Sequence, residues 1–439
     1  MLGRILQALK IKGKERKDVG VNVGVRLSAR ERDLLELLRL DGTLTAVRIA
    51  ETYSISTRQA ERLLTGLRKR AFSSAGDRTR PGIGRSWAEP PHGNLIFAII
   101  RRMGIKILGT GSYLPPKVLT NADIATALDT SDEWIFSHTG IHARHVAEEG
   151  ETTSTMATKA AKAALDAAGL APADVGLIVL ATSTPDYNTF PSTACIVQGL
   201  LGCTNAGAYD LQAACAGFVY ALEQARGWLA CNPGQKALVI GSECLTRIVD
   251  WTDRSSCILF GDGAGAVVVG SDGTASAPAA TTILGADGTG RHFIQRTGGT
   301  MASLPLDPQT GIPTAEPQVQ RSTLSLMGHE VFAFAVKTMS RVTHDLCARK
   351  GVETSSLDRV FAHQANGRII EACARRMKLP LEKFWLNLAD TANTSAASIP
   401  ISLDQAVRAG ELRDGMNVVL VGFGAGLTFG GTYLTWPHL

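Results

Sequence analysis

The chain has 439 residues, 45% of them hydrophobic and only 6% aromatic; this length exceeds one ordinary core, so two or three domains are expected, and the many aliphatic and small residues favour an α/β fold. Its most apolar short segment, residues 95–100, is followed at once by two arginines, which argues against a membrane-spanning protein. Residues 1–102 carry 21 Lys and Arg against 10 Asp and Glu, whereas the remainder carries 24 against 30, so the two pieces are expected to have different partners.

The eight cysteines are scattered along the chain without a CxxC pair or a paired His spacing. This distribution argues against a disulfide framework and against a metal site. No apolar core of a secretory signal opens the sequence. We therefore expect a protein of the reducing cytoplasm, with no membrane association.

The basic N-terminal piece is divided by its local patterns. Residues 1–27 form a basic leader without a sustained period. Residues 28–71 contain two capping-box patterns followed by amphipathic helical runs and end in a basic helix, which weakly resembles the helix-turn-helix of transcription regulators. This pattern is equally typical of a three-helix bundle with a solvated basic face. Residues 72–102 are rich in Gly, Pro, Ser and Arg and are predicted to be a linker.

From residue 103 onward, helical and strand-like patterns alternate. Ala-rich helical runs at 155–168 and 219–229 alternate with apolar strand-like runs at 175–180 and 237–241, and a strand is predicted at 104–111. Such alternation predicts βαβ units with helices covering both faces of buried sheets.

A glycine-rich segment at 261–270 is echoed at 422–431. A repeated unit near the end of each half predicts two similar halves, which we bound at residues 103–275 and 276–439.

Cys215 lies among Ala and Gly between a strand-like run and the helical run that begins near residue 219. At the start of a helix, amide donors and the positive end of the helix dipole lower a thiol pKa, and small neighbours leave room for a substrate. For a cysteine considered on its own, however, a buried packing role is the more common one.

His363 and Asn393 follow in the second half, each at the predicted end of a strand before a helix. One thiol, one His and one Asn are compatible with two chemistries. In a cysteine hydrolase the His is the base and the Asn orients it. In a Claisen condensing enzyme both donate hydrogen bonds to a thioester carbonyl and stabilise an enolate.

From residue 103 to the C-terminus the sequence closely resembles the 3-oxoacyl-[acyl-carrier-protein] synthase III family, which starts type II fatty acid synthesis. The matching motifs are GTGSYLP (109–115), TSDEWI (130–135), FPSTAC (190–195), ACAGF (214–218), GDGAGA (261–266), HQAN (363–366) and NTSAAS (393–398). The resemblance implies a thiolase-like αβαβα fold of two similar halves. It also implies a homodimer that uses acyl-CoA and malonyl-acyl carrier protein and no cofactor.

The resemblance assigns roles to specific positions. Cys215 becomes the nucleophile, and His363 and Asn393 bind the malonyl thioester carbonyl during decarboxylation. Around these three, the resemblance implies an oxyanion hole at Ala425, a wall at Phe423, an acyl-pocket contribution to the partner subunit from Phe190, CoA adenine contacts at Trp134 and Arg254, and carrier-protein contacts at Arg368, Arg375 and Arg376.

Three positions depart from the family pattern. His138 stands where Arg is usual, which puts a CoA phosphate contact in doubt, and Ala333 stands where Lys is usual, which removes one cation from the carrier-protein surface. Ala392 replaces the usual Gly before Asn393. Residues 291–320 also fit the family poorly, so primer length and branching are not determined by the sequence.

Three alternatives remain open. One is an acyltransferase of secondary metabolism with the same fold, forming an ester or an amide. Another is an acyl-CoA-responsive regulator that binds DNA through residues 28–71. The third concerns only residues 1–102: because relatives begin near Met103, that piece is also consistent with an upstream start assignment.

Overall fold

The computed structural model describes residues 105–271, 280–296 and 323–437. The leader (1–27), the helical segment (28–71) and the linker (72–102) lie outside these residues, and the predictions made for them stay predictions. Among the described helices, none is both long and apolar enough to cross a bilayer.

The first half is built on a mixed five-stranded sheet. Its order is β1 (Lys106–Tyr113), β7 (Asp262–Gly270), β6 (Lys236–Cys244), β4 (Val175–Ala181) and β5 (Gly207–Leu211). Strand β4 is parallel to both of its neighbours, whereas β7 is antiparallel to both β1 and β6. Nearly every residue of β6 and β7 is buried, because helices cover both faces of the sheet.

The second half repeats this order. Its sheet runs β8 (Thr281–Ala286), β13 (Thr428–Thr435), β12 (Asn417–Gly424) and β11 (Arg359–Ala362). Phe384 then pairs with Val360 as an isolated parallel bridge in the place that β5 has in the first sheet. The parallel and antiparallel senses also correspond strand by strand. The two halves therefore have the same topology, as the glycine echo predicted.

The two glycine-rich segments, 261–270 and 422–431, do not lie on equivalent strands. Gly261 leads directly into β7, whereas Gly422 and Gly424 end β12 and the equivalent strand β13 begins only at Thr428. The duplication was correctly inferred, but the residue-by-residue match between 261–270 and 422–431 was wrong. The two halves share their order of strands, whereas their glycines lie at different positions along equivalent strands.

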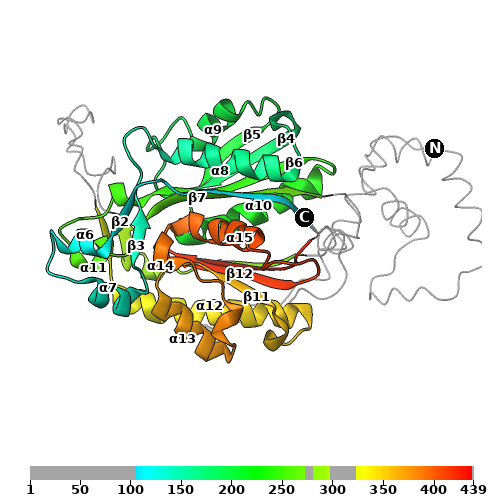
Figure 1. Ribbon diagram of the computed structural model, residues 1–439. Helices are drawn as coiled ribbons and strands as arrows, with labels where there is room; N and C mark the ends of the chain where they lie inside the picture. The colour runs from blue at the N-terminus through cyan, green and yellow to red at the C-terminus, as the bar shows by residue number, and fades with distance from the viewer. Residues whose placement is uncertain (1–104, 272–279, 297–322, 438–439) are drawn as a thin grey trace, which may run out of the picture. The chain divides into compact units, whose positions relative to one another are not determined.

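Helices form three layers around the two sheets, and Figure 1 shows them from top to bottom. The helices are α8 (Thr153–Ala168) and α9 (Thr193–Leu201) on the outer face of the first sheet, α10 (Gly217–Cys231) and α15 (Ser398–Arg408) between the sheets, and α12 (Gly328–Lys350) and α13 (Gly367–Met377) on the outer face of the second. This layering confirms the thiolase-like αβαβα fold.

Small residues allow these layers to approach closely. A side-chain carbon at Gly109 would lie 2.4 Å from the carbonyl oxygen of Ala164, and one at Gly111 would lie 2.3 Å from that of Ala160. The Ala-rich face of α8 therefore packs directly on the backbone of β1. This packing explains both the alanines of the helix and the first Gly-x-Gly motif.

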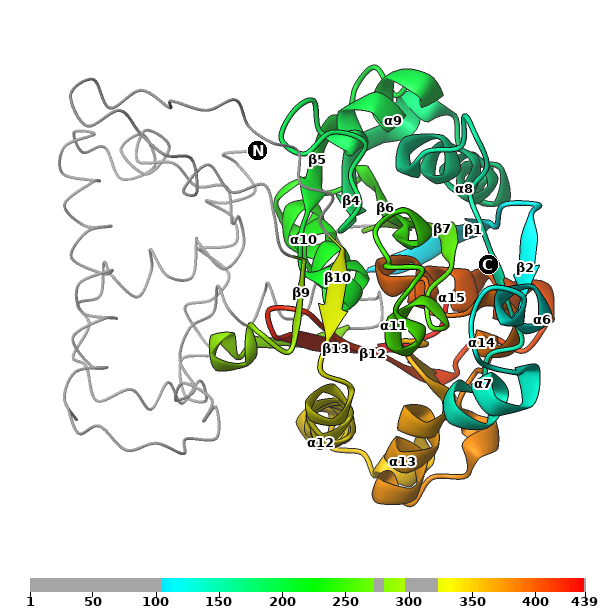
Figure 2. The ribbon, with the colours of Figure 1, turned by 90° about the vertical axis from the view of Figure 1, so that its left-hand side faces the viewer.

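Short elements gather at one end of the sheets (Figure 2). They are the paired strands β2 (Val118–Thr120) and β3 (Ala143–His145), the paired strands β9 (Ile294–Arg296) and β10 (Leu324–Leu326), and the helices α6 (Asn121–Ala125), α7 (Asp132–Thr139), α11 (Arg254–Cys257) and α14 (Leu388–Thr391). Residues of α7, α11, β9 and β10 line the main cavity of the molecule.

Candidate active site

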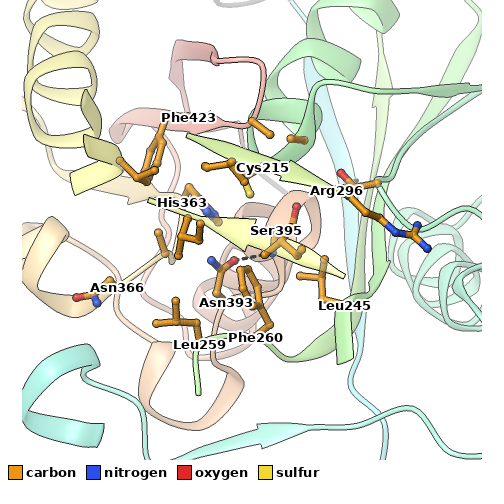
Figure 3. Close-up of a pocket in the computed structure, with 18 of the residues that line it drawn as sticks. Cys215, Leu245, Leu259, Phe260, Arg296, His363, Asn366, Asn393, Ser395 and Phe423 are labelled. Carbon is orange, nitrogen blue, oxygen red and sulfur yellow. Dashed lines mark hydrogen bonds between the residues drawn. The ribbon is translucent and has the colours of Figure 1, made fainter. Parts of the chain in front are cut away.

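A cavity of about 1010 Å³ opens between the two halves. Cys215, His363 and Asn393, which are far apart in the sequence, all line it. Figure 3 shows the sulfur of Cys215, the ring of His363 and the amide of Asn393 gathered in one part of this cavity. The structure thus brings together the three residues that the sequence singled out.

Cys215 lies in a short 3₁₀ turn, Ala214–Ala216, which leads into α10. A side-chain carbon at Gly424 would lie 2.5 Å from the amide nitrogen of Cys215. One at Gly241 would lie 2.2 Å from the carbonyl oxygen of Ala396. The small residues around the nucleophile therefore let three backbone segments converge there.

His363 directly follows β11, and its amide donates to the carbonyl of Val421 at 2.8 Å. Its Nδ1 lies 2.7 Å from Oγ of Ser398, which directs the opposite edge of the ring, with Nε2, toward the cavity. Next along the chain, the Gln364 amide donates to two backbone carbonyls, and Asn366 caps the start of α13. The HQAN motif therefore presents one reactive group and two groups that fix the turn.

Asn393 is held on both sides by backbone bonds. Its amide donates to the carbonyl of Leu259 at 2.9 Å, and its carbonyl accepts from Gly261 at 3.1 Å. Its side-chain Oδ1 accepts a hydrogen bond from the amide of Ser395 at 2.9 Å. Because the oxygen is occupied in this way, the NH₂ group of Asn393 is left to donate into the cavity.

Burial sets the protonation of the two central groups. It raises the pKa of the Cys215 thiol to about 12; the charge of Glu243 raises this pKa further, while a hydrogen bond from Ser395 opposes the shift. The expectation that a helix start would lower this pKa was wrong, because desolvation of the thiolate outweighs the dipole. Burial lowers the pKa of His363 to about 3, so its ring is neutral at physiological pH.

Three polar residues near the nucleophile were missed by sequence reasoning. Glu243 is buried at the end of β6, where the amide of Ser183 and the hydroxyl of Thr184 donate to its carboxylate. Its signal was a single acidic residue shortly after the apolar run 237–241. Ser395 and Ser398 were part of a quoted motif, but neither was given a role.

The other predicted residues divide by whether they reach the cavity. Phe423, Ala425 and Trp134 line it. The Phe423 ring packs edge-on against the His363 ring at 5.6 Å. Arg254 does not line the cavity; its guanidinium lies over the Trp134 ring at 4.6 Å.

The other positions to which the resemblance gave a role lie on the surface. Phe190 is 81% exposed. On α13, Arg368, Arg375 and Arg376 are exposed, and Arg375 pairs with Glu371 at 3.6 Å.

Two of the three departures lie at the site. The His138 ring stacks on Trp134 at 4.3 Å, and Ala392 has φ of 55° and ψ of −163°. Ala333, the third, is exposed on α12. Within the described residues, no three His, Cys, Asp or Glu side chains form a group that could hold a metal ion.

Two family models match the chain. The model described as 3-oxoacyl-[acyl-carrier-protein (ACP)] synthase III matches residues 209–288, and the model of its C-terminal part matches residues 347–436. A β-ketoacyl-[acyl-carrier-protein] synthase III of Caldanaerobacter subterraneus is 45% identical over 332 residues, covering 75% of this chain and 97% of the relative. The chain belongs to the 3-oxoacyl-[acyl-carrier-protein] synthase III family. It is a condensing acyltransferase, as the motifs predicted.

Other members of this family are similarly related. The synthase III of Xanthomonas axonopodis pv. citri is 44% identical, with coverage of 76% of this chain and 99% of the relative. The solved synthase III of Aquifex aeolicus superposes with a TM-score of 0.67 at 41% identity, covering 76% of this chain and all of the other. The priming β-ketosynthase of the R1128 polyketide pathway gives a TM-score of 0.70 at 35% identity, with coverage of 76% and 97%.

Proposed function

We propose that Cys215 accepts a short acyl group from acyl-CoA, with CoA leaving as the thiol that takes up the Cys215 proton. The carbanion formed from malonyl-acyl carrier protein then attacks this acyl-cysteine, and the Cys215 thiolate leaves. The observation that carries the proposal is the position of Asn393, whose NH₂ group is directed into the cavity that Cys215 and His363 also line. A hydrolase would instead need the Asn side chain to orient the His. Here the Nδ1 atom of His363 faces Ser398 instead.

His363 and Asn393 donate hydrogen bonds to the thioester carbonyl of the malonyl group. Loss of carbon dioxide leaves an electron pair that moves onto this oxygen, and two neutral donors in a water-poor site stabilise the charge without protonating the carbanion. The low pKa of His363, caused by burial, suits this role because an imidazolium would protonate the enolate. Neither step exchanges electrons with a carrier, so the mechanism assigns no cofactor and CoA is only a substrate.

The oxyanion of the acyl-transfer step is bound by the backbone amides of Cys215 and Ala425. Support comes from the cavity wall at Ala425 and from the closeness of Gly424 to the Cys215 amide. Backbone amides in such a position stabilise a tetrahedral intermediate by about 2.7–4 kcal/mol for each donor. Phe423 closes the side of the cavity next to His363.

The CoA adenine binds between Trp134 and Arg254. The guanidinium lies directly over the indole at 4.6 Å and donates to the carbonyl of Asp129 at 2.6 Å. Because these two groups stack on each other, an adenine ring enters between them only when Arg254 moves away from the indole. His138, stacked on the same indole, replaces the arginine that is usual in the family, and we propose a weaker contact to a CoA phosphate there.

The acidic carrier protein docks on the exposed basic side chains of α13, which are Arg368, Arg375 and Arg376. Asn366, which caps the start of this helix, lines the cavity, so a carrier protein bound there can deliver its thioester arm to Cys215. Ala333 on α12 contributes no charge to this surface.

The enzyme acts as a homodimer. Strand β5 is the outer strand of its sheet and carries the exposed Tyr209, an edge that a second copy would cover. The exposed Phe190 is a second apolar side chain that such an interface would bury. Phe190 then reaches the acyl pocket of the partner subunit. All eight cysteines are free, which supports a reducing, cytoplasmic location.

The function is tested by mixing the purified protein with acyl-CoA and malonyl-acyl carrier protein. We expect a 3-oxoacyl-carrier protein and one equivalent of carbon dioxide. The absence of both with acetyl, branched and longer primers would contradict the proposal.

A role in polyketide priming is the second candidate, favoured by the similarity to the R1128 priming ketosynthase. Complementation of a strain that lacks the initiating synthase separates the two candidates. Growth supports fatty acid initiation, and failure to grow with retained condensation in vitro supports the polyketide role.

A further inference from the structure

Glu243 is a fully buried carboxylate near the end of β6, and its neighbours are hydrogen-bond donors. The amide of Ser183 donates to its two oxygens at 3.1 and 3.0 Å. The hydroxyls of Thr182 and Thr184 donate at 3.2 and 2.6 Å. These two hydroxyl oxygens accept the amides of Thr184 and Cys244, which leaves their hydrogens for the carboxylate. Such a ring of donors favours the ionised form of Glu243.

Ser395 connects this carboxylate to the nucleophile. Its side chain is hydrogen-bonded to Glu243 and also to the thiol of Cys215. Figure 3 shows Ser395 beside Cys215 in the wall of the cavity. A serine hydroxyl has one hydrogen, and a carboxylate accepts a hydrogen bond more strongly than a thiol does. The Ser395 hydrogen is therefore directed to Glu243, and the S–H of Cys215 donates to the Ser395 oxygen.

The backbone of Ser395 has an uncommon conformation. Its φ is 49°, in the left-handed region that favours glycine. The amide of Ser395 donates to the Asn393 side chain, and its carbonyl accepts from the Ser398 hydroxyl, each at 2.9 Å. A residue in such a conformation costs about 1–3 kcal/mol, and it persists where the surrounding structure enforces it, commonly at functional sites. The turn thus holds a hydroxyl between the thiol and the carboxylate in spite of this cost.

We propose that Ser395 and Glu243 form a proton relay that receives the thiol proton of Cys215 during acyl transfer. This inference rests on the proposed function, because it names the group that activates the nucleophile in the first half-reaction. As the sulfur bonds to the thioester carbonyl carbon, the S–H hydrogen moves to the Ser395 oxygen and the Ser395 hydrogen moves to Glu243. When the bond between that carbon and the CoA sulfur breaks, the proton returns through Ser395 to the CoA thiolate. Glu243 is then a carboxylate again, and CoA leaves as a thiol.

An internal proton acceptor matters once acyl-CoA fills the cavity. Before binding, hydroxide can reach Cys215 through the cavity, whereas a bound thioester excludes water. Burial lowers the pKa of His363 to about 3 and raises that of Glu243, so the carboxylate is the stronger base of the two. Burial also raises the pKa of the adjacent Cys244 to about 12, which keeps this thiol neutral. The relay therefore ends at Glu243.

The first experiment measures thiol ionisation and acyl transfer in Glu243→Gln. This variant keeps the size of the side chain but cannot accept a proton. Loss of its charge lowers the pKa of Cys215, so alkylation by iodoacetamide should become faster near neutral pH. Acyl-cysteine formation from acyl-CoA, followed by rapid quenching and mass spectrometry, should instead become about 100-fold slower, the loss expected for a general base.

Ser395→Ala interrupts the same relay and should slow acyl transfer by a similar factor. In both variants a rise in pH should restore acyl transfer, because a thiolate formed before acyl-CoA binds needs no acceptor. Ser402→Ala and Glu223→Gln are matched controls that should retain the wild-type rates. Ser402 is buried on α15 and contacts Asn387 at 3.2 Å, whereas Glu223 pairs with an arginine on α10.

Faster acyl transfer in Glu243→Gln would show that the carboxylate acts on the thiol through its charge alone and would overturn the relay. Loss of alkylation and acyl transfer together, without recovery at high pH, would show a merely structural role and overturn it as well. The acyl-transfer measurement needs no malonyl-acyl carrier protein. A wild-type protein that forms acyl-Cys215 but does not condense it would therefore contradict the proposed function, while the variants still decide the relay.

Discussion

The backbone of Gly424 passes so close to Cys215 that a side-chain carbon at 424 would lie 2.5 Å from the Cys215 amide nitrogen. Replacement by alanine must displace either β12 or the nucleophile turn. We expect Gly424→Ala to lower the rate of acyl-cysteine formation by about 100-fold, the loss typical of one oxyanion-hole donor. Gly227→Ala is the matched control, because nothing lies within 4 Å of that position and its rate should be unchanged. Normal kinetics for Gly424→Ala would contradict the assigned oxyanion site.

The high thiol pKa predicts how Cys215 reacts with alkylating reagents. Because burial raises this pKa to about 12, the thiolate forms only at high pH, and alkylation by iodoacetamide should accelerate about tenfold for each pH unit above neutrality. Peptide mass spectrometry measures the rate at Cys215 separately from the exposed Cys195 and Cys231, which should react first. Complete modification of Cys215 should abolish acyl transfer. A plateau of its alkylation rate below pH 9 would be inconsistent with the raised pKa.

Glu243 contributes to that pKa through its negative charge. Removal of the charge in Glu243→Gln should shift the alkylation profile of Cys215 to lower pH, since the thiolate then has no anion beside it. Glu223→Gln changes a charge on α10 that pairs with Arg226, and it should leave the profile in place. If both variants retain the wild-type profile, Glu243 does not control the ionisation of the nucleophile.

Ala392 adopts a backbone conformation that favours glycine, with φ of 55° and ψ of −163°. Such strain costs about 1–3 kcal/mol, whereas loss of one buried methyl group costs about 0.8 kcal/mol. We therefore expect Ala392→Gly to raise the free energy of unfolding by about 1 kcal/mol in urea titrations. Ala389→Gly, within the helix α14, should lower it by about 0.5–1 kcal/mol. A loss of stability in both variants would argue against strain at Ala392.

Trp134 tests the binding of CoA separately from the chemistry. Trp134→Ala should raise the KM for acyl-CoA about 5- to 150-fold, because base stacking on an aromatic side chain contributes about 1–3 kcal/mol. With an acyl-pantetheine substrate, which lacks the adenine, wild type and variant should have the same KM. A similar rise in KM with both substrates would show that Trp134 acts on the pantetheine part of the substrate and not on the adenine.

Much of the fold was predictable because its patterns are local. The Ala-rich period of α8 and the apolar runs of β4 and β6 need only neighbouring residues to be recognised, and each was predicted within a few residues of its observed bounds. The mixed direction of the first sheet was not predictable in this way. The antiparallel pairing of β7 with β1 depends on contacts between residues about 150 positions apart.

The sequence by itself determined the chemistry, because the residue types Cys215, His363 and Asn393 and their motifs are properties of the chain. Only the tertiary structure decided the protonation and the hydrogen-bond partners of those groups. A pKa depends on the surrounding solvent and charge, and burial therefore raised that of Cys215 and lowered that of His363. The direction of the Asn393 amide and the partner of the His363 ring depend on single contacts, with Ser395 and Ser398. Such contacts are fixed only when the folded backbone brings these groups within hydrogen-bond distance.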